Sequence, residues 1–218
     1  MRTADALMSN AVLNQVALLG VVESEPRLRL EKKPFRLNVA VRVPTPTGIP
    51  GTQDNLVTIV KEGNLAVDIR PALAESATVL VTGALRSQRT TDGQAVNIWV
   101  QAQGIWRADD LRRLPALDPG AAPIRRLNHV CLLGAVAKEP QIRVTADGHL
   151  RMTFLIAVSM PPWTKCAQPN YFKVCRWGNS VRQESARLAV GTPVVVIGAL
   201  RSRRGGMNNV EVYALAIQ

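Results

Sequence analysis

Short runs in which hydrophobic and polar residues alternate cover most of this chain, and the pattern predicts β-strands. The run NYFKVCRW at 170–177 shows it most clearly, because successive side chains of a strand point to opposite faces. The residues predicted on one face are Tyr171, Lys173, Cys175 and Trp177. Those predicted on the other face are Phe172, Val174 and Arg176, and we place Phe172 in the core together with Phe154.

The rest of the second half predicts further strands and one short helix. Asp147-Gly148 is a hairpin signal between two alternating runs. After Gly178-Asn179 the period becomes helical, with Ser180 and Gln183 in a capping-box pattern and Gly191 as the stop. The flanking strands are predicted over 129–140, 141–147, 149–160, 192–203 and 208–217, the last two around Gly205-Gly206.

The first half repeats this plan. NQVALLGVVESEPRLRL at 14–30 matches NHVCLLGAVAKEPQIRV at 128–144, and VLVTGALRSQRT at 79–90 matches VVVIGALRSRRG at 194–205. A period this long indicates a duplicated domain, because solenoid repeats are much shorter. The predicted elements are strands over 14–22, 36–43, 55–60, 78–88 and 96–106, a hairpin at Lys32-Lys33, and a helix near 64–75 that Pro71 starts, kinks or leaves irregular.

Each half therefore reads as three strands, one helix and two strands, the order of an OB-fold, a five-stranded Greek-key barrel. The predicted fold class is all-β with one short helix per domain, in two tandem OB-folds. We expect a first domain over 1–107, a Pro-rich and extended linker over 108–127, and a second domain over 128–218.

The positive charge is concentrated in the second half. Residues 119–218 hold 13 Lys and Arg against 4 Asp and Glu, which gives +9 of the chain's formal +11. Such a balance favours a polyanionic partner, although a solvated basic surface would have the same composition. No apolar run is long enough to span a membrane, and residues 1–14 lack a signal-peptide core, so a cytoplasmic protein without a membrane partner is expected.

The composition offers little to a catalytic or metal site. The three cysteines, Cys131, Cys166 and Cys175, have no CxxC spacing, and His129 and His149 are the only histidines. The sequence also has no Gly-rich phosphate loop and no nucleophile elbow. We therefore expect a protein that is not an enzyme and that needs no metal or cofactor.

Binding single-stranded nucleic acid without sequence preference combines a basic groove with exposed aromatic faces on which bases stack. Trp163 lies in the loop MPPWTKCAQPN, and Tyr171 and Trp177 share the strand face that also carries Lys173. The basic candidates on neighbouring strands or their tips are Arg143, Arg151, Lys165, Arg201, Arg203 and Arg204. Two alternatives stay open, since Trp177 can cap the barrel by packing and Arg203-Arg204 can be an ordinary solvated turn.

The first copy lacks these side chains. Leu56, Thr58 and Glu62 stand at the positions of the second copy's Tyr, Lys and Trp, and the preceding loop has no aromatic residue. We therefore expect the first domain to bind strands weakly or not at all and to act as scaffold or subunit contact. Trp99 and Trp106 are candidates for an interface with the other barrel or the linker, or for plain packing.

Three segments of the second half resemble the bacterial single-stranded DNA-binding protein family. NHVCLLGAVAKEPQIR resembles that family's first strand, MTFLIAV its second, and YFKVCRWGNSVRQESARLAVGTPVVVIGALRSR its third strand, helix and fourth strand. The two-domain chain is similar to the Deinococcus–Thermus type, in which two chains pair so that four OB-folds surround the strand. The resemblance implies base stacking on Trp163, Tyr171 and Trp177, and backbone contacts from Lys173 and His129.

Two departures accompany the resemblance. The sequence stops at YALAIQ without the family's acidic tail, and the hairpin after Arg201-Ser202 is short. Recruitment of repair enzymes through such a tail is therefore not expected.

The resulting hypothesis is a homodimeric, nucleoid-associated protein that binds single-stranded DNA in replication, repair or recombination. The alternatives are an OB-fold adaptor that binds protein, as in a primosome, and an OB-fold protein that binds RNA. A hydrolase is a more distant alternative.

Overall fold

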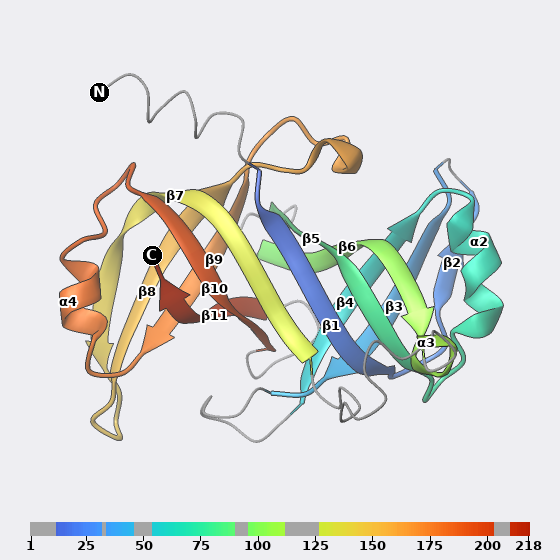
Figure 1. Cartoon of the computed structure of the whole chain (residues 1–218), viewed down its shortest axis with the longest axis horizontal. Coiled ribbons are helices and arrows are strands. Elements are labelled where there is room, and N and C mark those ends of the chain that lie inside the picture. Colours follow the sequence, from blue (N-terminus) through green and yellow to red (C-terminus); the bar gives the residue numbers. More distant parts are fainter. Residues whose placement is uncertain (1–11, 32–33, 46–53, 90–95, 112–126, 203–209) are drawn as a thin grey trace. The chain divides into compact units, whose positions relative to one another are not determined.

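The structure is a computed structural model and describes residues 12–31, 34–45, 54–89, 96–111, 127–202 and 210–218. Its described residues form two compact units. We call the one formed by the described residues within 12–15, 130–198 and 212–218 the C-terminal unit, and the one formed by the described residues within 16–129 and 199–211 the N-terminal unit. The strands form two sets that can be followed by colour in Figure 1. The first set, β1–β6, runs from blue to green, and the second set, β7–β11, runs from yellow to red.

The second set of strands closes on itself. It consists of β7 (Leu127–Val144), β8 (Leu150–Val158), β9 (Asn170–Trp177), β10 (Pro193–Ser202) and β11 (Val210–Ile217). The strands neighbour one another in the order β7-β8-β9-β11-β10, and β10 pairs back onto β7. The pairing of β9 with β11 is parallel, whereas β7–β8, β8–β9 and β10–β7 are antiparallel. This is the closed Greek-key order expected of an OB-fold.

The first set has the same order. It consists of β1 (Asn14–Val22), β2 (Arg27–Arg29), β3 (Arg36–Val43), β4 (Asn55–Glu62), β5 (Thr78–Arg89) and β6 (Val96–Arg107). The neighbours are β3-β4-β6-β5-β1, and β1 pairs with β3 to close the ring. The β4–β6 pairing is parallel, like β9–β11. The short strand β2 pairs antiparallel with β3, and Arg29 lies opposite Arg36.

The first strand of the second barrel bends so that it reaches both of its neighbours. Residues Val130–Ala135 of β7 pair with β10, and the part from Gly134 to Val144 pairs with β8. The register shifts on both sides of Lys138, which marks bulges that increase the local bend. In the first barrel β1 pairs with β5 and, through Val21 and Val22, with β3, and β2 adds further pairs with β3.

Each barrel is filled by the inward residues of the alternating pattern. Phe172, Ile156 and Met152 are fully buried in the second barrel, as are Leu18 and Ile59 in the first. Phe154 is buried as well, so both phenylalanines assigned to the core are confirmed. Burying one such side chain stabilises the fold by roughly 1.5–3 kcal/mol.

The helices are shorter than the sequence predicts. The helix α4 covers Val181–Ser185, and its N-cap residue Ser180 makes no side-chain cap hydrogen bond, so the expected capping box is absent. Gly191 has a positive φ of 87° but lies well beyond the helix end. In the first half α2 covers Leu65–Ile69, followed by the 3-10 helix η1 (Arg70–Ala72), which contains Pro71. Proline cannot donate the next backbone hydrogen bond, so the α-helix ends before it.

The turn expected at Asp147-Gly148 is present. The amide of Gly148 donates to the Thr145 carbonyl at 2.9 Å, and Gly148 has a φ of 77° that glycine tolerates without strain. Lys32-Lys33 and Gly205-Gly206 lie outside the described residues, as does most of the predicted linker. The helix α3 (Ala108–Leu111) follows β6 directly.

Candidate nucleic-acid interface

The outer sides of β7, β8 and β9 form one continuous face, which we call the β8–β9 face. Strand register aligns its residues in rows across the three strands. Side chains that lie opposite one another in neighbouring strands are in contact range on the same face. The rows are Arg143–Arg151–Trp177, Gln141–Thr153–Cys175, Lys138–Leu155–Lys173 and Ala135–Ala157–Tyr171.

This face carries aromatic side chains at both ends of β9 with a lysine between them. Tyr171 is 49% exposed, Lys173 is exposed, and Trp177 is half-buried. Their alternation with the fully buried Phe172 and Val174 confirms the predicted two-residue period over that stretch. Cys175 departs from it, because its side chain is fully covered although its row lies on the outer face.

One predicted basic residue, Arg151, is engaged with the protein itself. Its guanidinium lies over the Trp177 ring, 5.4 Å from the ring centroid, and its Nε donates to the Cys175 Sγ at 3.0 Å. A guanidinium over an indole face is a favourable cation–π arrangement. Arg151 therefore covers one side of the ring and restrains it.

Two basic side chains beside this arginine extend outward. Arg143 and Lys138 are both exposed, on the part of β7 that pairs with β8. The sequence pattern predicts Arg143 but misses Lys138, because a bulge on each side of Lys138 breaks the simple alternation. In a regular strand, Lys138 would face away from Arg143, because the two positions are an odd number of residues apart. The bulges bring both side chains to the same face.

The loop between β8 and β9 presents Trp163 on a fixed turn. The 3-10 helix η2 (Pro162–Thr164) holds it, and the Trp163 side chain is 38% exposed. The buried Thr164 donates from its hydroxyl to the Pro161 carbonyl at 2.7 Å. Lys165 follows in the left-handed backbone region, with a φ of 54°, and its amide donates to the Pro162 carbonyl at 3.0 Å. The loop thus has a defined shape, with an exposed lysine next to its tryptophan.

The remaining predicted site residues do not join this face. His129 is exposed near the start of β7, and Arg201 is half-buried near the end of β10, and both belong to the N-terminal unit. Arg203 and Arg204 lie outside the described residues.

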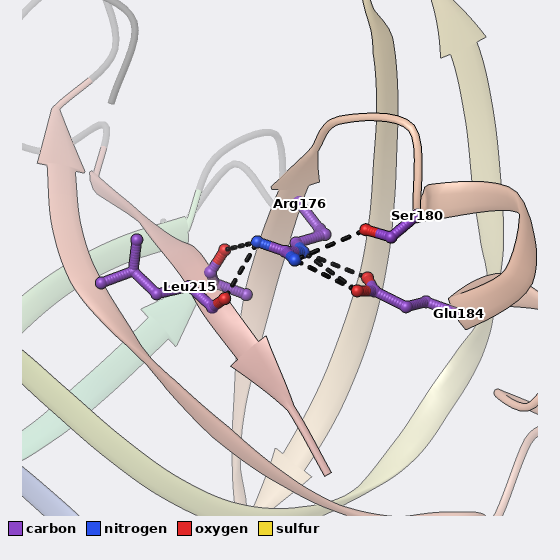
Figure 2. Close-up of polar contacts among 5 residues, drawn as sticks. Arg176, Ser180, Glu184 and Leu215 are labelled. Carbon is purple, nitrogen blue, oxygen red and sulfur yellow. Dashed lines mark hydrogen bonds and ion pairs between the residues drawn. The ribbon is translucent and has the colours of Figure 1, made fainter. Parts of the chain in front are cut away.

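Sequence reasoning missed the role of Arg176, on the opposite side of β9 (Figure 2). Its Nε and Nη2 each donate to Glu184 of α4 at 3.1 Å, and Nη2 also reaches the Ser180 Oγ at 3.5 Å. Nη1 donates to the carbonyls of Leu215 at 2.9 Å and Ala214 at 3.3 Å. We call this set the Arg176 cluster. It ties the third strand of the barrel to the helix and to the last strand.

The Arg176 cluster also explains the missing capping box. The Ser180 hydroxyl faces the arginine, and the carboxylate of Glu184 is its ion-pair partner, with side chains about one-fifth exposed on both sides. A two-pronged guanidinium–carboxylate contact fixes geometry better than a single point contact. No sequence pattern indicated this pairing. The two-residue period places Arg176 on the core face with Phe172 and Val174, and it does not show which residue would pair with the charge.

The first barrel carries different side chains at the matching positions, as expected. Leu56 and Thr58 are half-buried, and Glu62 is exposed at the end of β4. The Nε2 of Gln101 donates to the Glu62 carboxylate at 3.2 Å. Trp106 is 43% exposed.

Lys61 and Cys131, which lie outside the β8–β9 face, have shifted pKa values. Burial lowers the pKa of the Lys61 ammonium, which donates to the Gln103 carbonyl at 2.6 Å. Burial raises the pKa of the Cys131 thiol on β7. Within the described parts of the chain, no group of three or more His, Cys, Asp or Glu side chains is placed to hold a metal ion. None of the helices among these residues is long and apolar enough to cross a membrane.

Comparison with known proteins places this geometry in context. Residues 127–218 match the sequence profile of the Single-strand binding protein family. A deletion mutant of the single-stranded DNA binding protein from Thermus aquaticus superposes with a TM-score of 0.72 at 21% identity, covering 94% of this chain and 93% of that chain. The wild-type Thermus aquaticus protein gives 0.68 at 22% identity, over 95% and 93% of the two chains.

A further solved structure is similar to part of the chain. The small single-stranded DNA-binding protein from Streptomyces coelicolor is 33% identical over 41% of this chain and 89% of that chain, with a TM-score of 0.35. No curated protein matches the chain. The likeness to the Thermus aquaticus structures over nearly the whole length confirms the expected fold of two tandem OB domains.

Proposed function

We propose that this chain, which belongs to the single-strand binding protein family through its second domain, binds single-stranded DNA without sequence preference. The family consists of binding proteins, so its membership agrees with the expectation that the chain is not an enzyme. The observation that carries the proposal is the β8–β9 face, where the exposed Tyr171 and the half-buried Trp177 lie beside lysine and arginine on neighbouring strands. This face of an OB-fold is the one that commonly binds oligonucleotides.

The proposed mechanism divides the work between rings and charges. Bases stack on Tyr171, Trp177 and Trp163, and each stack contributes about 1–3 kcal/mol without regard to base identity. Phosphates pass the exposed side chains of Lys173 and Lys138. Neutralising phosphates releases counterions, so the affinity falls as the salt concentration rises.

The proposal extends to assembly and cellular role. We infer a homodimer with four OB-folds around one strand, acting in DNA replication, repair or recombination. The similarity of the whole chain to the two-domain Thermus aquaticus protein supports the dimer, because two barrels per chain make four barrels with two chains.

The test is a titration with oligothymidine followed by tryptophan fluorescence at low and moderate salt. The wild-type protein should show strong quenching and an affinity that weakens with salt. Trp163→Ala and Trp177→Ala should each weaken binding at least about fivefold, the lower end of the loss of one stacked base. Trp106→Ala, an exposed tryptophan of the first barrel, is the matched control and should bind like wild type.

The other outcomes identify the alternatives. Absence of binding even at low salt would contradict the proposal and point to an adaptor whose aromatic residues contact protein. If oligouridine of the same length competes better than oligothymidine, the protein binds RNA. Unchanged affinity in both alanine variants would exclude stacking on these rings.

A further inference from the structure

Each barrel carries its short helix at the same place in its own fold, so α2 and α4 (Figure 1) can be compared position by position. Gly63 and Gly178 stand just before the two helices, and both have a positive φ, of 91° and 115°. Counting on from these glycines, Ala66 matches Val181, and both side chains are fully buried. The two helices therefore pack on their barrels through the same position, and their outward positions are equivalent.

The outward side of α2 is more apolar than its barrel requires. Leu65 and Val67 are 58% and 38% exposed. At the matching positions α4 has the polar residues Ser180 and Arg182. Since the second barrel folds with polar side chains there, burial in the barrel does not explain the leucine and the valine of the first.

Negative charge accompanies these apolar side chains. Asp68 is one turn after Leu65, so the two are neighbours on the helix surface, and Glu75 is exposed a few residues after η1. The basic residue of this segment, Arg70, is paired with Glu25. No ion pair joins Asp68 or Glu75 to another residue in the part of the chain that the structure describes. We call Leu65, Val67, Asp68 and Glu75 the α2 surface.

The outward side of α4 has the opposite charge. Arg182 and Arg187 are exposed, and neither has an ion pair within the described segments. The carboxylate of this helix, Glu184, is already paired with Arg176. An apolar side chain, Val190, is 59% exposed just beyond the helix. We call Arg182, Arg187 and Val190 the α4 surface.

From this complementarity we propose that the α2 surface of one chain docks on the α4 surface of a second copy of the chain. Opposite charges direct the two surfaces toward each other, and the contact covers exposed apolar side chains on both sides. The contact is head-to-tail, because it uses different surfaces on the two partners. A head-to-tail contact that does not close into a ring can be repeated from copy to copy.

The inference rests on the proposed function, because the DNA strand is what brings the copies together. Two short helices bury much less area than a stable interface needs, so the contact is weak between free molecules. Copies bound side by side on one strand meet at an effective concentration on the order of millimolar, at which a weak contact forms. The protein should therefore fill a long strand in contiguous runs, whereas its binding to a short oligonucleotide does not depend on the contact.

The test is an electrophoretic mobility shift of oligothymidine of about 200 nucleotides, long enough for several copies, with too little protein to cover every strand. The wild-type protein should give bare strands and fully coated strands with few intermediates. Asp68→Arg combined with Glu75→Arg should give intermediates instead, with at least about fivefold lower cooperativity between neighbours, because like charges then face each other. Its affinity for an oligothymidine of about 10 nucleotides, which fits one barrel, should equal that of wild type.

Two further variants separate the contact from general effects of charge and folding. Asp109→Arg combined with Asp110→Arg makes the same change of charge at exposed positions of α3 and should coat strands like wild type. Leu65→Ser introduces the residue that α4 has at the matching position, and it should lower the cooperativity without changing the charge.

A rescue experiment tests the pairing of the two surfaces. Arg182→Glu combined with Arg187→Glu should also give intermediates, and adding both to the chain with the reversed α2 surface should restore contiguous runs. Intermediates from the wild-type protein, contiguous runs from either reversed variant, or no recovery in the combined chain would each overturn the pairing. The proposed function would stand after any of these results, and it is overturned if the wild-type protein binds oligothymidine of neither length.

Discussion

An arginine can serve nucleic-acid binding without contacting a phosphate. Arg151 has its Nε on the Cys175 sulfur and its guanidinium over Trp177, so in the proposed binding mode it contributes by restraining the ring on which a base stacks. An aromatic side chain whose rotamer is already fixed loses less conformational entropy when a base stacks on it. Lys173 lies on the same face of β9 with an exposed side chain, and in the proposed binding mode its charge meets a phosphate.

This difference separates two substitutions of similar shape. Lys173→Met should lower the slope of log affinity against log salt by about 0.7, because one phosphate contact is lost. Arg151→Met should leave that slope nearly unchanged and instead reduce the fluorescence quenching and the affinity, because Trp177 becomes less ordered. Oligothymidine titrations at several salt concentrations measure both quantities. A slope change in Arg151→Met as large as in Lys173→Met would show that Arg151 contacts a phosphate.

At this scale the sequence predicts side chains on a regular strand and misses partners across strands. Tyr171 and Lys173 could be placed from a two-residue period alone, because buried Phe172 and Val174 alternate with them. The contact of Arg151 with Trp177 depends on the β8–β9 register, which no local pattern specifies. The same limit applies in the first barrel, where Arg36 lies over the Trp99 ring and the two residues come from strands far apart in the sequence.

Among the elements, α4 is held less by its own sequence than by one side chain of β9. The helix has only five residues and no side-chain cap, so it is far below the length at which a helix is stable alone. The Arg176 cluster and the buried Val181 fix it to the barrel. The helix therefore forms only with the barrel around it.

Glu184→Gln tests that dependence. The substitution keeps the shape of the side chain but leaves the half-buried Arg176 guanidinium facing a neutral amide, so the free energy of unfolding should fall by about 1–2 kcal/mol. Urea denaturation followed by circular dichroism measures the change. Glu139→Gln, which removes an exposed carboxylate of β7, should have almost no effect. Equal stabilities for the two variants would exclude a structural role for the Arg176 cluster.

The glycine of the repeated GALR motif has a packing role that both barrels share. A Cβ at Gly198 would overlap the Tyr213 carbonyl oxygen, and a Cβ at Gly83 would overlap the Gln101 carbonyl oxygen. The fourth and fifth strands of each barrel thus approach one another where a side chain has no room. The register of β5 and β6 shifts at Gly83, which is consistent with this crowding.

Gly198→Ala should therefore lower the free energy of unfolding by about 1–3 kcal/mol, the usual range for an overpacked site. Thermal melts of the full chain measure it, with Gln183→Ala, an exposed change in α4, as the reference for a neutral substitution. A melting temperature equal to that of the reference would contradict the close approach of the two strands.

For the whole molecule, the sequence predicted the fold better than the site. Duplication supplied two readings of each strand, so the barrel order could be predicted even where one copy was ambiguous, as at Pro71. The differences between the copies were harder to predict. Comparing β4 with β9 position by position shows Glu62 where Trp177 would be, and it does not show that Arg36, opposite Glu62, lies over Trp99 of β6.

Assembly is testable at the same scale. A chain of 23.7 kDa that forms the proposed homodimer should sediment at twice that mass at micromolar concentration, with and without oligothymidine. Sedimentation equilibrium measures it. A mass of one chain under both conditions would exclude the dimer and leave each molecule with the two barrels of its own sequence.

The parallel contact between β9 and β11 has a consequence for how the second barrel opens. Backbone pairing there is short, with Val174 opposite Val212 and Cys175 opposite Tyr213, and the guanidinium of Arg176 then takes the next two carbonyls of β11. A side chain thus makes part of the hydrogen bonding between β9 and β11. Rotation of Arg176 alone would break its two hydrogen bonds to β11, whereas breaking backbone hydrogen bonds requires a strand to move. Local opening of this contact should cost less free energy than global unfolding. The amides that line it are where deuterium should first enter the barrel, while β11 keeps its pairing with β10 along its other edge.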